Sequence, residues 1–176
     1  MWSMLCGLQL IGGHLVNVLF GVVEHRHKKV VHTMLQADPD LIYDGKSFYP
    51  VFSEDIRNAR REILIVSPFM RKSRITQIQR LLSGPMLNGA KVVVVTRPAE
   101  DFPEKDHKSV IENTQKLEAG GVAVRHRAGF HQKFTVIDGQ IVWYGSVNFL
   151  SFGTAEESIM RFTSHDIAGQ LTDTVV

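Results

Sequence analysis

The chain has 176 residues, 44% of them hydrophobic, which suits one domain with a sizeable core and an additional segment. Its net charge of +2 is too small to indicate a polyanionic partner by itself. Cys6 is the only cysteine, so an internal disulfide framework is excluded, and no cysteine and histidine cluster resembles a zinc site.

Residues 1–40 are expected to form an apolar or helical extension, either packed on the domain or left over from a longer protein. Residues 1–23 contain no charged side chain and are long enough to reach across a bilayer. Glycines and polar residues interrupt this stretch, and it lacks the positive start of a secretory signal. We therefore expect a cytoplasmic protein. A membrane anchor through residues 1–23, flanked by the basic cluster at 25–29, is the alternative.

After residue 40, short apolar runs alternate with helical patterns. The first helix is expected at 53–61, with Ser53 as its N-cap, and the second is expected to end near Ser83-Gly84-Pro85. The remaining helices are expected at 107–117 and from 165 onward, and strands at 63–66, 91–96, 122–125, 134–138, 140–144 and 158–162. This order predicts an α/β fold, a layered α-β-α sandwich with a mixed β-sheet, in a single domain covering residues 41–176.

The stretch from His131 to Asn148 carries the chemistry. Asp138-Gly139 separates two β-rich runs, which is a strong hairpin signal. Alternate residues of a strand share a face, so His131 and Lys133 should point the same way. Ser146 and Asn148 repeat that alternation beyond the second strand, where Gly145 would let backbone come close to a ligand.

Each of these residues also has a purely structural explanation. His131 could be a half-buried histidine and Lys133 a solvated strand lysine, but together they favour phosphate binding. The turn alone explains Asp138. Ser146 and Asn148 could be turn residues, although both offer donors to an anionic oxygen.

The spacing resembles the signature of the phospholipase D superfamily: His-x-Lys, four residues, Asp, six residues, Gly-Ser-x-Asn. Every specified position is present, from His131 to Asn148. Within that superfamily, the segments at 43–52, 65–69, 141–146 and 156–161 look like the phospholipase-D-like modules attached to bacterial helicases and restriction-type proteins. The resemblance runs from about residue 30 nearly to the end of the chain.

The resemblance implies a phosphodiesterase in which one histidine attacks phosphorus and a second protonates the departing alcohol. His131 would be the nucleophile, with Lys133, Ser146 and Asn148 holding the phosphate, and neither metal nor cofactor would be needed. A carboxylate would orient the ring; Glu157 is the candidate and Glu156 the alternative. The resemblance implies a supporting role for Asp138.

Only one complete motif is present, so a homodimer is expected to supply the second histidine across a two-fold axis. Three functions are considered for the chain. The first is a DNA endonuclease, whose salt-sensitive phosphate contacts would come from basic residues around one strand. The second is a phospholipase D type lipid headgroup hydrolase. The third is a non-catalytic DNA-binding module of a helicase or defence assembly. The basic residues are Arg57, Arg60, Arg61, Arg71, Lys72 and Arg74, for which a solvated helix face is the simpler explanation.

Overall fold

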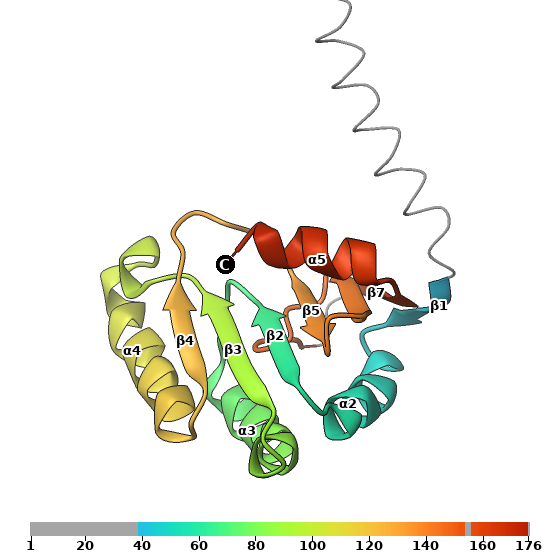
Figure 1. The fold of residues 1–176 in the computed structure, drawn as a ribbon. Helices are drawn as coiled ribbons and strands as arrows, with labels where there is room; N and C mark the ends of the chain where they lie inside the picture. The colour runs from blue at the N-terminus through green and yellow to red at the C-terminus, as the bar shows by residue number, and fades with distance from the viewer. Residues whose placement is uncertain (1–38, 154–155, 176) are drawn as a thin grey trace, which may run out of the picture. The chain divides into compact units, whose positions relative to one another are not determined.

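The computed structural model describes residues 39–153 and 156–175. The expected extension at 1–40 and the alternative membrane anchor at 1–23 therefore lie almost entirely outside the described residues. The described part centres on a seven-stranded mixed sheet with the order β1-β7-β6-β5-β2-β3-β4 (Figure 1). Its strands are β1 (Pro39–Asp44), β2 (Glu62–Val66), β3 (Lys91–Thr96), β4 (Ala123–His126), β5 (Phe134–Ile137), β6 (Ile141–Gly145) and β7 (Ser158–Thr163).

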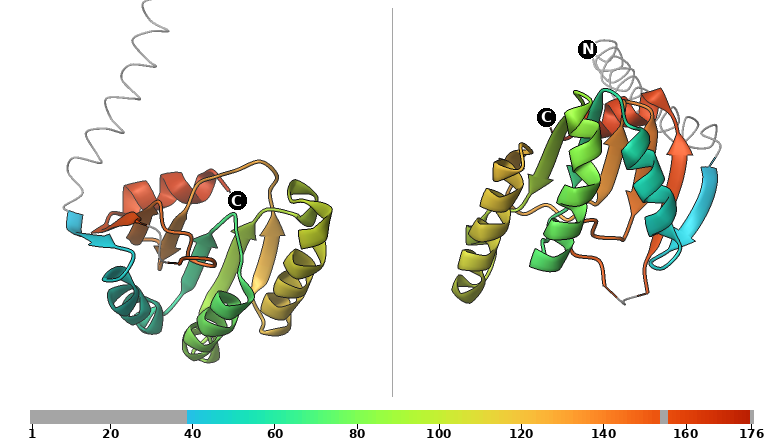
Figure 2. Two further views of the ribbon diagram at one scale, coloured as in Figure 1. Left: turned by 180° about the vertical axis from the view of Figure 1, so that it is seen from behind. Right: turned by 90° about the horizontal axis from the view of Figure 1, so that it is seen from below.

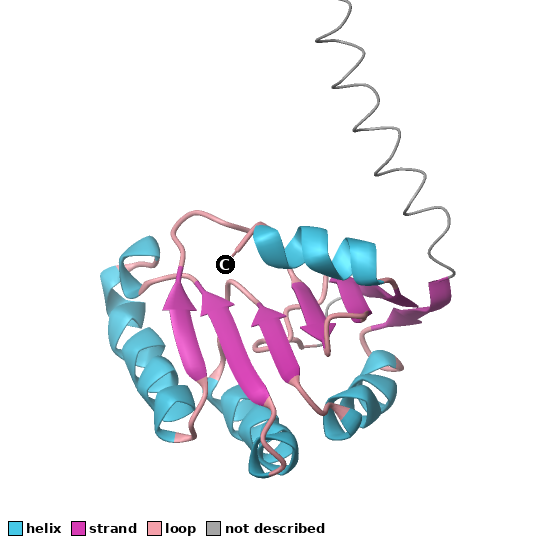
Figure 3. Ribbon diagram, in the orientation of Figure 1, coloured by secondary structure: helices cyan, strands magenta, loops and turns pink. Residues whose placement is uncertain are grey.

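Helices cover both faces of this sheet. Three of them, α2 (Phe48–Asn58), α3 (Lys72–Leu87) and α4 (Glu104–Ala119), line up on one face, as the view from below in Figure 2 shows. The last, α5 (His165–Asp173), lies on the other face against β5 and β6 (Figure 3). The expected layered α-β-α sandwich in an α/β domain is thus confirmed.

The direction of the strands follows from their connections. β2, β3 and β4 are joined through helices and pair in parallel, whereas β5 pairs antiparallel with both β2 and β6. The hairpin between β5 and β6 makes the sheet mixed, as its Asp138-Gly139 turn predicts. Every residue of β5 is buried, because layers on both faces exclude water from the middle of the sheet.

Two helices differ from their expected bounds. α2 begins five residues before Ser53, which is 2% exposed and lies inside the helix instead of capping it. Pro50 does not prevent this, because an N–H in the first turn has no partner within the helix. α3 continues through Gly84 and Pro85 to Leu87, since Leu81, Leu82 and Pro85 are all buried on one side and their burial outweighs the helix-breaking tendency.

The sequence analysis did not predict β1. This strand pairs antiparallel with β7 and includes two residues that had been assigned to the extension. Ile42 on β1 is 67% exposed, so the strand lacks the buried alternation by which a strand is recognised in a sequence.

The core between α2 and the sheet is rich in aromatic rings. The indole of Trp143 lies 5.7 Å from the ring of Phe52 and donates its N–H to the carboxylate of Asp55, which also pairs with Arg161 at 2.7 Å. Burial raises the pKa of Asp55, and the hydrogen bond from Trp143 opposes that effect.

None of the helices in the described ranges is long and apolar enough to cross a membrane.

Candidate active site

Three segments that connect strands lie together at one edge of the sheet, where the ends of the strands meet, and they form the candidate site. The register places Val66 at the end of β2 beside Phe134 at the start of β5, and Phe134 beside Tyr144 near the end of β6. Gly145 in turn lies beside Ile159 at the start of β7. The segments at 67–71, 127–133, 146–153 and 156–157 therefore lie at the same edge, although they are far apart in the sequence.

His131 and Lys133 are in contact at this edge. The Nζ atom of Lys133 lies 3.1 Å from Nδ1 and 3.4 Å from Nε2 of His131, and it donates to the carbonyl oxygen of His131 at 2.6 Å. Both residues lie in the connection directly before β5, so the strand alternation that predicted a shared direction is not the cause of their contact. The exposed imidazole can reach a ligand, whereas Lys133 is only 6% exposed.

Phe69 forms an apolar wall beside these two groups. Its ring meets the imidazole of His131 edge to face, with 6.0 Å between centroids, and its centroid lies 6.0 Å from Nζ of Lys133. Contact with an aromatic ring restricts the positions that an imidazole can take. The sequence analysis gave Phe69 no role at the site, because nothing in its local pattern links it to a histidine more than sixty positions away.

The site is a pocket of about 640 Å³ that opens to solvent. It is lined by His131, Gln132, Lys133, Tyr144, Gly145, Ser146, Asn148, Glu156 and Glu157. An adjoining hollow of about 650 Å³ shares Asn148 and Glu157 with it and is also lined by Phe69 and Arg71. Glu156 and Glu157, the two carboxylates considered as partners of His131, both line the pocket.

Glu157 and Lys133 affect one another's protonation. Burial raises the pKa of Glu157, and the positive charge of Lys133 offsets only part of this rise. Burial lowers the pKa of Lys133, while the negative charge of Glu157 acts in the opposite direction. Glu157, which is half-buried, is the carboxylate whose charge acts on Lys133. Its neighbour Glu156 is exposed.

Asn148 presents an unused polar atom. Its Oδ1 atom is buried and has no hydrogen-bond partner in the part of the chain that the structure describes. An unpaired buried amide oxygen is unfavourable until a donor reaches it. Because Asn148 lines both hollows, its carboxamide is placed to meet a ligand that spans them.

Ser146 and Gly145 contact the neighbouring strand. The hydroxyl of Ser146 accepts from the Ser158 N–H at 3.0 Å and donates to the Ser158 carbonyl at 3.3 Å. A Cβ at Gly145 would lie 2.3 Å from the Ser158 carbonyl oxygen. The close approach that Gly145 permits is therefore that of β7, and both motif residues hold β6 and β7 together at the rim of the pocket.

Asp138 lies at the opposite end of β5 from His131 and Lys133. Its carboxylate accepts hydrogen bonds from the backbone N–H groups of Arg60, Arg61 and Glu62 at 2.9, 2.8 and 3.0 Å. Burial opposes ionisation, but these hydrogen bonds and the charge of Arg61 outweigh it and lower the pKa of Asp138. Asp138 also has a φ of 52°, which suits its place in the hairpin turn. These contacts join the turn to the segment between α2 and β2.

A second carboxylate holds the segment that leads into His131. Asp101 accepts from the Gly129 N–H at 2.6 Å and from Nε of Arg97 at 2.7 Å, and these bonds lower its pKa. The guanidinium of Arg97 lies 5.8 Å from the centroid of Phe69. Asp101 therefore holds the segment at Gly129, and Arg97 lies near Phe69, the ring that contacts the imidazole. The sequence analysis missed them, because the polar loop around 101 carries no motif.

The family described as "Cardiolipin synthase, PLD-like domain" matches residues 52–175. The chain belongs to this phospholipase D-like family. The family inferred from the motif is thus confirmed, whereas the likeness to modules attached to helicases stays a prediction. No curated protein matched the sequence.

Solved structures share the phospholipase D-like fold. Nuc from Salmonella typhimurium, a phospholipase D family member, superposes with a TM-score of 0.59 at 17% identity, over 76% of this chain and 90% of Nuc. NucT from Helicobacter pylori superposes with a TM-score of 0.56 at 14% identity, over 76% of this chain and 93% of NucT. Phosphatidylserine synthase from Haemophilus influenzae gives 0.62 at 13% identity, over 75% of this chain but only 35% of the synthase.

The phospholipase D-like pocket combines an accessible imidazole with groups that suit an anion. Lys133 supplies positive charge, Asn148 an amide, and Glu157 a carboxylate near both. Within residues 39–153 and 156–175 no group of three or more His, Cys, Asp or Glu side chains could hold a metal ion. The pocket thus brings an imidazole, an ammonium and a carboxamide together in one hollow.

Proposed function

We propose that this protein is a metal-independent phosphodiesterase, a DNA endonuclease that acts through a phosphohistidine in a site shared by two copies of the chain. The observation that carries the proposal is the contact between the exposed imidazole of His131 and the buried ammonium of Lys133, 3.1 Å apart, in a pocket that also contains Asn148 and Glu157. Family membership supports a substrate that contains a phosphodiester bond.

In the proposed reaction, the neutral imidazole of His131 attacks phosphorus. A nitrogen–phosphorus bond forms while the bond from phosphorus to the bridging oxygen breaks, and an imidazolium of the second copy gives its proton to that oxygen. The same second ring then takes a proton from water as the water attacks the phosphohistidine and releases His131. Lys133 and Asn148 would stabilise the extra negative charge on the phosphoryl oxygens, and Glu157 the cationic imidazole.

The need for a second copy follows from the number of histidines. In the described part of the chain, His131 alone among the histidines lines the pocket. His107 and His165 contact the carbonyl oxygens of Phe102 and Gly139, away from the pocket lining. The chain covers 90% of Nuc but about a third of phosphatidylserine synthase, which supports one half-site per chain. A reaction that needs one neutral and one protonated imidazole is expected to have a bell-shaped pH dependence.

Two observations favour a lipid as the second candidate substrate. The matching family is described as cardiolipin synthase, and one structural neighbour is a phosphatidylserine synthase. DNA is preferred because the hollow beside the pocket carries Arg71, an exposed arginine suited to a phosphate next to the one that reacts. A helicase partner and a non-catalytic DNA-binding role remain further alternatives from the sequence.

A paired assay tests the proposal. Purified full-length protein is incubated in EDTA with supercoiled plasmid and, separately, with phosphatidylcholine vesicles. We expect plasmid nicking that His131→Ala abolishes and that His126→Ala, at an exposed histidine outside the pocket lining, preserves. Headgroup release without nicking would favour the lipid hydrolase, and DNA retention without turnover would favour the binding module. Trapping a phosphorylated histidine and mapping it to His131 would support the intermediate.

Mixing two kinds of subunit tests the shared site. Wild-type chains are unfolded and refolded together with His131→Ala chains in varying proportion. If each site uses both imidazoles, activity falls with the square of the wild-type fraction, because a mixed dimer has lost one of its two rings. A linear decrease would show that each chain works alone and would overturn the shared site while leaving the phosphodiesterase proposal intact.

A further inference from the structure

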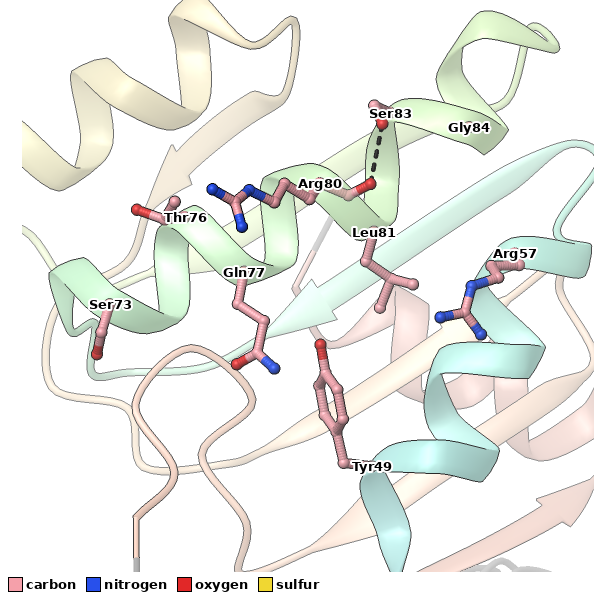
Figure 4. A pocket seen from close by; sticks show the side chains of 9 residues that line it. All are labelled: Tyr49, Arg57, Ser73, Thr76, Gln77, Arg80, Leu81, Ser83 and Gly84. Atoms are coloured by element: carbon pink, nitrogen blue, oxygen red, sulfur yellow. Dashed lines mark hydrogen bonds between the residues drawn. The ribbon is translucent and has the colours of Figure 1, made fainter.

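A second pocket lies between α2 and α3 and shares no lining residue with the pocket of His131. Its volume is about 690 Å³, within the range of small-molecule sites. Most of its lining side chains carry hydrogen-bond donors, and none is acidic. They are Tyr49, Arg57, Ser73, Thr76, Gln77, Arg80, Leu81, Ser83 and Gly84 (Figure 4).

The carboxamide of Gln77 is held in one orientation. Nη1 of Arg74 donates to Oε1 of Gln77 at 2.7 Å, which occupies the acceptor end of the amide. Arg74 is itself fixed, because its Nε donates to the carbonyl of Phe152 at 3.0 Å and its guanidinium lies 3.7 Å from the Phe152 ring centroid. The amide nitrogen of Gln77 is therefore left as a donor, and Figure 4 shows it turned toward Tyr49.

Arg57 and Tyr49 point into the same space. Figure 4 shows the guanidinium of Arg57 and the hydroxyl of Tyr49 directed to either side of Leu81. Arg57 pairs with Glu54 at 3.6 Å, but both side chains are more than half exposed, so this pair is weak and leaves most of the guanidinium donors available. Donors from two helices thus converge on a single hollow.

Further positive charge surrounds the hollow. Arg80 is exposed on the same face of α3. The Nζ atom of Lys116, on α4, donates to the Thr76 hydroxyl at 2.6 Å, which places a third cation beside the lining. The donors of this hollow, in a lining that contains no carboxylate, suit a compact anion with several oxygens.

We propose that the pocket between α2 and α3 binds a phosphate group, with Arg57, Tyr49 and the amide nitrogen of Gln77 as its donors. The phosphate can belong to a small phosphorylated molecule or to a polynucleotide, since both present the same oxygens. This site is separate from the proposed hydrolysis and does not depend on it. Arg74 orients Gln77 but also holds Phe152, on the connection that carries Asn148 and Glu157, so it is unsuitable as a test variant.

The test is an NMR titration of the full chain with inorganic phosphate at constant ionic strength. It uses a Lys133→Met background, so that the catalytic pocket competes less for phosphate. We expect the side-chain amide signals of Gln77 to shift and to saturate. Arg57→Ala should weaken this binding about tenfold, because it removes a charged hydrogen bond. Gln77→Met, monitored through the backbone signals of α2 and α3, provides a second variant should Arg57→Ala fold poorly.

Arg60→Ala is the matched control, because it removes the same charge just after α2 without altering the lining. Its phosphate affinity should stay close to that of the parent, and a loss equal to that of Arg57→Ala would overturn the proposal in favour of diffuse charge. Parallel titrations with a nucleoside monophosphate and with a short oligothymidylate identify the source of the phosphate. A response of Gln77 to either supports the site, and no response to any of the three probes overturns it.

Discussion

Nζ of Lys133 lies 3.1 Å from Nδ1 of His131 and 2.6 Å from the carbonyl oxygen of the same residue. The ammonium is thereby tied to the backbone that carries the imidazole. Burial lowers the pKa of Lys133, and the negative charge of Glu157 acts against this effect.

Replacing Lys133 should separate catalysis from folding. Lys133→Met keeps the length of the side chain but removes its charge, so we expect turnover to fall by about 10²–10³, as when an oxyanion donor is lost. Thermal unfolding should not shift downward, because a buried charge has been removed from the folded state. Nicking assays and calorimetry measure the two effects, with Lys108→Met, at an exposed lysine outside the pocket lining, as the control. A large loss of stability without a change in turnover would contradict this.

Glu157→Gln should stabilise the protein while lowering its activity. The folded-state pKa of Glu157 is raised, so its contribution to stability is fully present below the unfolded value of 4.5 and is lost as pH rises through the folded value. The variant should therefore melt higher than wild type near pH 7.5, and the difference should disappear well below pH 4.5. Glu156→Gln, at the exposed neighbour, should melt like wild type at both pH values.

Asp138→Ala should destabilise the fold with little effect on turnover per folded molecule. The pKa of Asp138 is lowered in the folded state, so its contribution is present above 3.8 and is lost as pH falls through the folded value. We expect a loss of about 1.5–3 kcal/mol near neutral pH from the missing charged hydrogen bonds. Urea unfolding at several pH values checks this. Asp138→Asn, which keeps one acceptor oxygen, should lose less, and equal losses would argue against these bonds as the cause.

Gly145→Ala should separate β6 from β7. The new methyl group would meet the Ser158 carbonyl oxygen at 2.3 Å and the Ile159 Cα at 2.7 Å, which are backbone atoms that cannot rotate away. We expect a loss of about 1–3 kcal/mol, typical of overpacking. Gly84→Ala is the control, because nothing lies within 4 Å of its added methyl and alanine favours a helix. Its melting temperature should stay level or rise.

The layered sandwich, the mixed sheet and six of its seven strands could be predicted from periodicity and turn residues. The strand at 91–96 was predicted to the residue, because five apolar or β-branched residues stand between an exposed lysine and a proline-containing loop. Helix ends were less predictable. Ser53 and Gly84-Pro85 carry local signals that the burial of Phe48 and of Pro85 overrides, and burial of this kind depends on contacts with the distant sheet.

The motif predicted which residues lie together better than it predicted each residue's contacts. It brought His131, Lys133 and Asn148 to one place, but it could not reveal that Ser146 and Gly145 face β7. Phe69, Arg97 and Asp101 were missed for the same reason: they reach His131 through pairings between strands and loops that no short sequence pattern records.

The pocket residues lie on separate connections between strands, so a change in one connection need not alter the pairing of the strands. A longer or differently charged segment between β6 and β7 would alter which molecule fits without disturbing the pairing of β5 with its neighbours. The molecule that fits the pocket can therefore change while the contact between His131 and Lys133, directly before β5, stays the same.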